Sequence, residues 1–163
     1  MLDMRFGVNI LPFLVGLVVW MGAAEKPPFL LRVHLQAPEG AKGMVSVPVT
    51  LFQPNETIAI QSLPEVSEKE IRKISTRADG TILVEFDDFG RTKLEAGTST
   101  GRGFILVVLV NGRVVYAPRI DTVITNGSIL LPPGAVTPEE IAQVNGQVEK
   151  RRGEKLKDLG DGK

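Results

Sequence analysis

The chain has 163 residues and no cysteine, and its 19 lysines and arginines are balanced by 19 aspartates and glutamates. Disulfide, thiolate and redox chemistry are therefore excluded, and stability has to come from burial and hydrogen bonding. A neutral total argues against nucleic acid and against an anionic membrane surface as partners, because both select a concentrated positive charge.

Residues 1–24 have the organisation of an export signal. Arg5 precedes an apolar run over residues 10–20, and small residues follow at 22–24. That order is typical of a secretory signal, and the apolar run is shorter than the roughly 20 residues that a membrane-spanning helix needs. We predict that the segment is cleaved, with retention as an anchor as the alternative, and that no other segment spans a membrane. The protein is then periplasmic or secreted, and residues 25–149 are long enough for a single domain.

Apolar periodicity and turn residues predict an α+β fold with a mostly antiparallel sheet. Strands are expected over residues 29–36, 44–52, 57–60, 81–86, 104–110 and 129–131. Pro48 places the second of these at a sheet edge, because proline cannot donate to the ladder. The seven consecutive apolar residues at 104–110 predict a strand that is covered on both faces. Helices can cover one face, and the N-terminal strands or a partner must shield the other.

A β-hairpin is predicted at Asn111-Gly112, which lie between two apolar runs. Both central residues of a type I′ turn need positive φ, which glycine adopts freely and asparagine tolerates. The turn sets the facing pairs, which are Val110–Arg113, Leu109–Val114, Val108–Val115 and Val107–Tyr116. Pro118 then withdraws an N–H group and ends the second strand.

Two helix starts share the same local pattern. A hydroxyl N-cap is followed three residues later by a glutamate that can return the hydrogen bond, at Ser67 with Glu70 and at Thr137 with Glu140. The first helix is expected to end near Thr76 and the second near Lys150.

A third helix is expected to begin at Asp87 or Asp88 and to reach about Ala96, because Gly97 is a natural stop. We expect the three helices to lie chiefly on one face of the sheet. Residues 150–163 carry mixed charge and little to bury, so they are predicted to form a disordered tail, into which the frayed end of the second helix passes.

The sequence does not point to a catalytic or metal site. The single histidine, His34, lies inside the first predicted strand, so nucleophilic catalysis and zinc binding are both poorly supported. The acidic group at residues 85–88 is better explained as a helix cap than as a calcium site. We therefore predict no enzyme, no metal and no cofactor. A small hydrolase or lyase with Asp87, Asp88 or Asp121 as its base remains the alternative.

Three polar residues that follow the hairpin form a weak binding-site candidate: Arg119, Asp121 and Asn126. An exposed Arg/Asp pair is more often solvated than functional.

Several short motifs occur in a fixed order over residues 86–144. They are Asp87-Asp88-Phe89-Gly90, Gly101-Arg102, Asn111-Gly112, Ala117-Pro118-Arg119-Ile120, Ile124-Thr125-Asn126-Gly127-Ser128 and Thr137-Pro138-Glu139-Glu140. In order and spacing this region resembles the head subdomain of the first periplasmic region of SecD, the export-motor subunit that assists the Sec translocon. Asn111 replaces the commoner aspartate of the family and preserves the turn.

The resemblance implies a fold and contact with polypeptide in transit. SecD also carries several membrane spans that couple to a proton gradient, and no segment after residue 24 here is long and apolar enough to be one. We therefore expect an exported, non-enzymatic binding or scaffold module, which contacts unfolded polypeptides or pairs with an envelope protein at a sheet edge. The other alternative is a self-associating structural protein that forms a homodimer through an uncovered sheet face.

Overall fold

The structure, a computed structural model of the chain, describes residues 28–40, 46–51 and 56–160. The predicted signal over residues 1–24 lies outside the described residues. Among the helices of the described part, none has the length and apolarity needed to cross a membrane.

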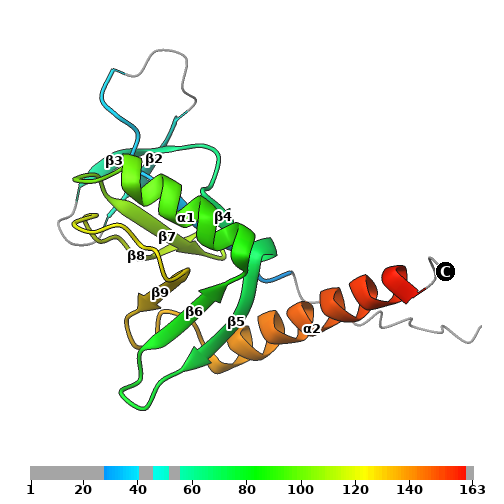
Figure 1. Ribbon diagram of the computed structural model, residues 1–163. Helices are drawn as coiled ribbons and strands as arrows, with labels where there is room; N and C mark the ends of the chain where they lie inside the picture. The colour runs from blue at the N-terminus through cyan, green and yellow to red at the C-terminus, as the bar shows by residue number, and fades with distance from the viewer. Residues whose placement is uncertain (1–27, 41–45, 52–55, 161–163) are drawn as a thin grey trace, which may run out of the picture.

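Three antiparallel sheets and two α-helices make up the described part of the chain (Figure 1). The strands are β1 (Leu31–Leu35), β2 (Ser46–Thr50), β3 (Thr57–Gln61), β4 (Val66–Ser67), β5 (Ile71–Thr76), β6 (Ile82–Phe86), β7 (Leu106–Val110), β8 (Arg113–Tyr116) and β9 (Ser128–Leu131). The helices are α1 (Asp88–Thr100) and α2 (Pro138–Gly160), with a 3₁₀ turn, η1, at Glu68–Glu70. The sheets have the strand orders β4-β1-β7-β8, β2-β3 and β5-β6-β9. The antiparallel α+β class is confirmed, with three sheets in place of one.

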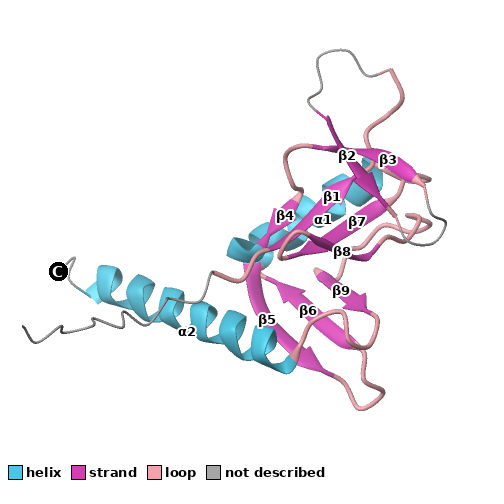
Figure 2. Cartoon of the chain, turned by 180° about the vertical axis from the view of Figure 1, so that it is seen from behind, coloured by secondary structure: helices cyan, strands magenta, loops and turns pink. Residues whose placement is uncertain are grey.

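Strand β7 is covered on both faces, as its unbroken apolar sequence predicts. Leu106, Val108 and Val110 belong to the main core. Val107, on the opposite face, packs with Leu51 and residues of β3 in a smaller second core. Helix α1 lies across one face of the four-stranded sheet, and the β2–β3 hairpin lies on the other (Figure 2). The N-terminal strands thus provide the shielding that the apolar sequence of β7 requires.

The turn between β7 and β8 has both central residues at positive φ, with Asn111 at 49° and Gly112 at 79°. The first two facing pairs are those predicted. The register then shifts, so that Val108 faces Tyr116 instead of Val115, and the predicted partner of Val107 is also wrong. The shift is a β-bulge, which lets the consecutive residues Val115 and Tyr116 both pack against the main core.

The helix predicted from Ser67 to Thr76 is wrong, so the described part of the chain has two α-helices where three were expected. Both backbone hydrogen bonds of the capping box at Ser67 and Glu70 form, but they cap only the single turn η1, and strand β5 comes next. Ile71 and Ile74, spaced like a helical stripe, are both buried from a strand because a bulge between Ile71 and Lys73 restores the facing of the second isoleucine.

Helix α1 passes through Gly97, where the sequence predicts its end, and finishes at Thr100 with Gly101 as C-cap. Its N-cap is Asp87, whose Oδ1 accepts a hydrogen bond from the Gly90 N–H at 2.8 Å. Gly97 is buried inside the helix, and a Cβ there would lie 2.8 Å from Oε2 of Glu65. This glycine therefore allows close packing and does not terminate the helix.

Helix α2 continues to Gly160, ten residues beyond the end predicted near Lys150. Arg151 donates to the backbone carbonyls of Glu68 and Ile71 at 3.0 and 3.2 Å. Asn145 donates to the Ile74 carbonyl and accepts from its N–H. Side chains of α2 thus satisfy backbone groups of η1 and of the edge of β5 that faces away from β6, which holds the helix in place.

Candidate binding groove

An open groove of about 410 Å³ lies between the β2–β3 hairpin and the neighbouring strands β1 and β7. Its apolar lining includes Val47, Pro48, Val49, Ile60 and Leu109, and its polar lining includes Arg32, His34 and Gln61. The groove is therefore a mainly apolar surface with a few polar groups, which is the usual composition of a binding site.

Strand alternation brings these side chains together. Along β1, Leu31, Val33 and Leu35 are buried in the main core, so Arg32 and His34 project from the opposite face. Leu109 of β7 lies on that same face and packs in the second core. In the hairpin, β2 and β3 pair throughout, and Val47 remains 45% exposed.

His34 forms part of the wall of the groove and is only 4% exposed. Its Nδ1 lies 2.7 Å from the backbone carbonyl oxygen of Gln61. Because a carbonyl can only accept, Nδ1 carries the proton, and the bond ties β1 to the end of β3. Burial lowers the pKa of His34, a shift that the hydrogen bond to Gln61 opposes and the nearby Arg32 reinforces. The sequence identifies this histidine but not its place in a groove.

Acidification is expected to destabilise the fold through His34. Its pKa in the folded state is below the unfolded value of about 6.5, so the unfolded chain binds more protons as the pH falls. The contribution of neutral His34 to the free energy of unfolding is present above pH 6.5 and is lost as the pH falls below that value. Urea unfolding between pH 8 and pH 5 should show this slope, and His34→Asn, which keeps a donor that does not titrate, should flatten it. An unchanged slope in the variant would contradict this assignment.

The three polar residues predicted as a weak binding site make separate local contacts. Arg119 donates to the Gly103 carbonyl at 2.7 Å. The backbone carbonyl of Asp121 accepts from Arg102, and the Asn126 side chain accepts from the backbone N–H two residues on. No hydrogen bond or ion pair of the described residues joins one member of the trio to another.

The carboxylates considered as a catalytic base also have identified contacts. Asp87 is the N-cap of α1, and the Asp88 carboxylate is exposed, 3.8 Å from the guanidinium of Arg91. No hydrogen bond or ion pair in the described part of the chain joins either of them to Asp121. Nor do the described residues contain a group of three histidine, aspartate or glutamate side chains that could hold a metal ion.

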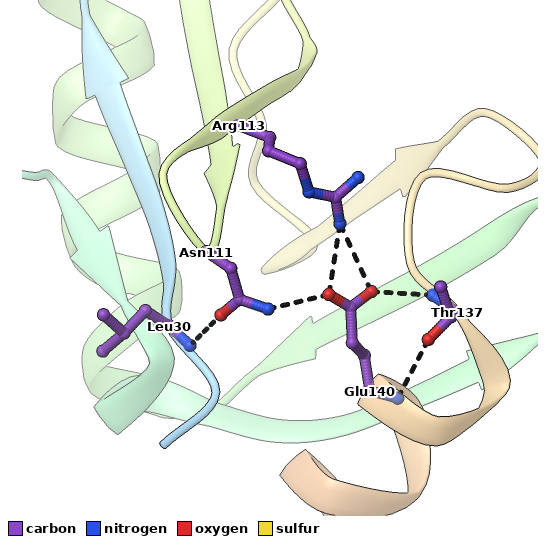
Figure 3. A network of polar contacts seen from close by, with 5 residues as sticks. All are labelled: Leu30, Asn111, Arg113, Thr137 and Glu140. Carbon is purple, nitrogen blue, oxygen red and sulfur yellow. Dashed lines mark hydrogen bonds and ion pairs between the residues drawn. The ribbon is translucent and has the colours of Figure 1, made fainter. Parts of the chain in front are cut away.

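A polar network links the hairpin tip to the start of α2 (Figure 3). The Glu140 carboxylate accepts from Asn111 at 2.7 Å, from Arg113 at 3.1 Å and from the Thr137 N–H at 2.9 Å. The other end of the Asn111 amide accepts from the Leu30 N–H. Burial raises the pKa of Glu140, but these hydrogen bonds and Arg113 outweigh it and hold that pKa below its usual value. The sequence predicts the turn and the capping box separately, and the structure brings them into contact.

The fold is an antiparallel α+β domain that carries an open, mainly apolar groove. No family model matches the chain, and no curated protein matches it. Solved structures do match it, among them two of SecDF. One is described as a membrane component SecDF that enhances protein export, with a TM-score of 0.50 and 18% identity over 72% of this chain and 60% of that chain. The other is a crystal structure of SecDF in a super-membrane-facing form, with a TM-score of 0.51 and 21% identity over 71% of this chain and 18% of that chain.

At these identities the likeness shows the fold, and the resemblance to SecD is confirmed at that level. The chain spans 60% of the first solved chain and 18% of the second. The activity of the whole SecDF protein therefore comes to this chain only as a proposal.

Proposed function

We propose that this chain is an exported, non-enzymatic module that assists protein export by holding extended segments of polypeptide. The observation that carries the proposal is the open apolar groove beside a sheet edge, on a fold shared with SecDF. A polypeptide in transit has not yet buried its apolar side chains, so it presents the chemistry that such a groove accepts.

The β2–β3 hairpin supplies the second element of recognition. Within the described residues β2 pairs only with β3, so its other edge is open to an incoming strand. An added strand would gain backbone hydrogen bonds along that edge and place alternate side chains against Val47 and Val49. Pro48, in the middle of β2, cannot donate, so the edge offers few hydrogen bonds and binding is reversible. Weak binding allows the exported polypeptide to be released.

The groove is tested in cells with a photoactivatable crosslinking residue at Val47. Under this proposal it captures exported chains in transit or components of the Sec machinery. The matched control carries the crosslinking residue at Leu156, an exposed leucine of α2 that does not line the groove. It should capture neither exported chains nor components of the Sec machinery. Equal capture from both positions, or none from Val47, would count against polypeptide binding in the groove.

Binding in solution gives the quantitative test. A fluorescent apolar peptide of about ten residues should bind the protein, and Val47→Glu should weaken the binding roughly tenfold because a carboxylate is then buried against apolar side chains. Leu156→Glu places the same charge on an exposed surface and should leave the binding unchanged. If the protein instead forms a concentration-dependent dimer that Val47→Glu dissociates, the groove serves self-association and the proposal fails.

A further inference from the structure

A second groove, of about 330 Å³, lies between strand β5 and helix α2. Its lining contains five cationic side chains and one carboxylate, together with Ile71 and Val148. The cations are Lys69, Arg72, Arg151, Arg152 and Lys155, and the carboxylate is Asp87. A formally neutral chain therefore concentrates positive charge at one place.

Two of the five cations are already paired with acids outside the lining. Arg72 lies 2.9 Å from Glu85, and Arg152 lies 3.1 Å from Glu149. The other three cations, Lys69, Arg151 and Lys155, have no ion-pair partner among the described residues. With Asp87 as the single carboxylate of the lining, these three cations leave the groove with an excess of two positive charges.

Arg151 is held in a fixed position at this groove. Its guanidinium donates from Nη1 to the Glu68 carbonyl and from Nη2 to the Ile71 carbonyl, and the residue is half-buried. The neutral carbonyls satisfy N–H groups without cancelling the charge. A guanidinium oriented in this way does not lose conformational freedom when an anion arrives, and its planar donors match the oxygens of a phosphate group.

We propose that this groove binds a phosphate group, carried either by a small soluble molecule or by a lipid headgroup. A phosphate monoester has a charge of about −1.5 to −2 at neutral pH, which matches the local excess of two positive charges. Arg151 is the fixed donor, and the flexible ammonium groups of Lys69 and Lys155 close on the ligand from the two walls. The site shares no lining residue with the groove beside β2 and does not depend on polypeptide binding.

The first experiment is a titration of the full chain with inorganic phosphate, followed by the amide NMR shifts of residues 68–71 and 148–155. Chloride at equal ionic strength controls for screening. The double variant Lys69→Gln with Lys155→Gln removes two cations that have no ion-pair partner among the described residues, and it should weaken phosphate binding about tenfold. The control variant, Lys150→Gln with Lys157→Gln, removes the same charge from exposed positions of α2 outside the groove. It should leave phosphate binding unchanged.

Vesicles distinguish the two sources of phosphate. A lipid headgroup is the source if the protein floats with phosphatidylglycerol vesicles but not with phosphatidylcholine vesicles. This flotation should be lost in the double variant Lys69→Gln with Lys155→Gln. Phosphate binding without flotation would assign a small soluble ligand. The proposal is overturned if the two double variants bind phosphate equally, if chloride reproduces the shifts, or if only an acidic peptide binds the groove.

Discussion

Replacing Leu94 with alanine is expected to lower the free energy of unfolding by about 3 kcal/mol. Leu94 is 1% exposed and belongs to the main core. It lies on α1, which contacts β4 of the four-stranded sheet and β6 of the three-stranded sheet. The cavity left by the lost methyl groups would open where the two sheets share one core, and the rigid strands around it cannot close over the space.

Urea unfolding followed by circular dichroism measures the effect, provided that the slope with denaturant is unchanged. The matched control is Leu63→Ala, the same substitution at a position that is 79% exposed, where a change within about 0.5 kcal/mol is expected. If Leu94→Ala cost no more than the control, α1 would not be an integral part of the core.

Local chemistry predicts the parts of the fold that depend on neighbouring residues. The turn forms at Asn111-Gly112 because asparagine and glycine tolerate the positive φ that both of its central positions require. The strands on either side form because their sequences are apolar runs. The segment over residues 67–76 is predicted wrongly because a capping box fixes only the first turn. The conformation at Ile71 and Ile74 depends instead on β6 and α2, which pack against that segment.

The end of α2 is predicted too early for a related reason. Residues 150–163 carry mixed charge and few apolar side chains, so composition alone predicts a frayed helix that passes into disorder. The contacts that order the first part of this stretch come from distant segments, where Arg151 reaches the carbonyls of Glu68 and Ile71. A hydrogen bond between residues about 80 positions apart leaves no local signal in the sequence.

Neither groove could be predicted from the sequence, because each is lined by residues that only the tertiary fold brings together. The first combines β2 and β3 with β1 and β7, and the second combines η1 and β5 with α2. The candidate formed by Arg119, Asp121 and Asn126 rests on proximity in the chain, and that criterion cannot find a groove lined by distant segments. Net charge is equally uninformative, since a neutral total averages over the local excess around Arg151.

Alanine at Gly90 is expected to destabilise the protein by about 2 kcal/mol, although alanine is the better helix former. Gly90 is buried in the first turn of α1, where a Cβ would lie 2.8 Å from the Cβ of Glu70 and 2.9 Å from the Cβ of Phe86. A Cβ position is fixed by the backbone, so no rotamer change can relieve either contact, and helix and strand have to separate.

Gly146→Ala is the matched control, since it makes the same change inside α2 at a position where an added Cβ would meet nothing within 4 Å. There the gain in helix propensity is unopposed, and we expect an increase in stability of about 0.5–1 kcal/mol. The two substitutions should therefore shift the urea midpoint in opposite directions. Stabilisation by both would mean that α1 and β6 are not in contact at Gly90, and the packing that joins the two sheets through α1 would have to be revised.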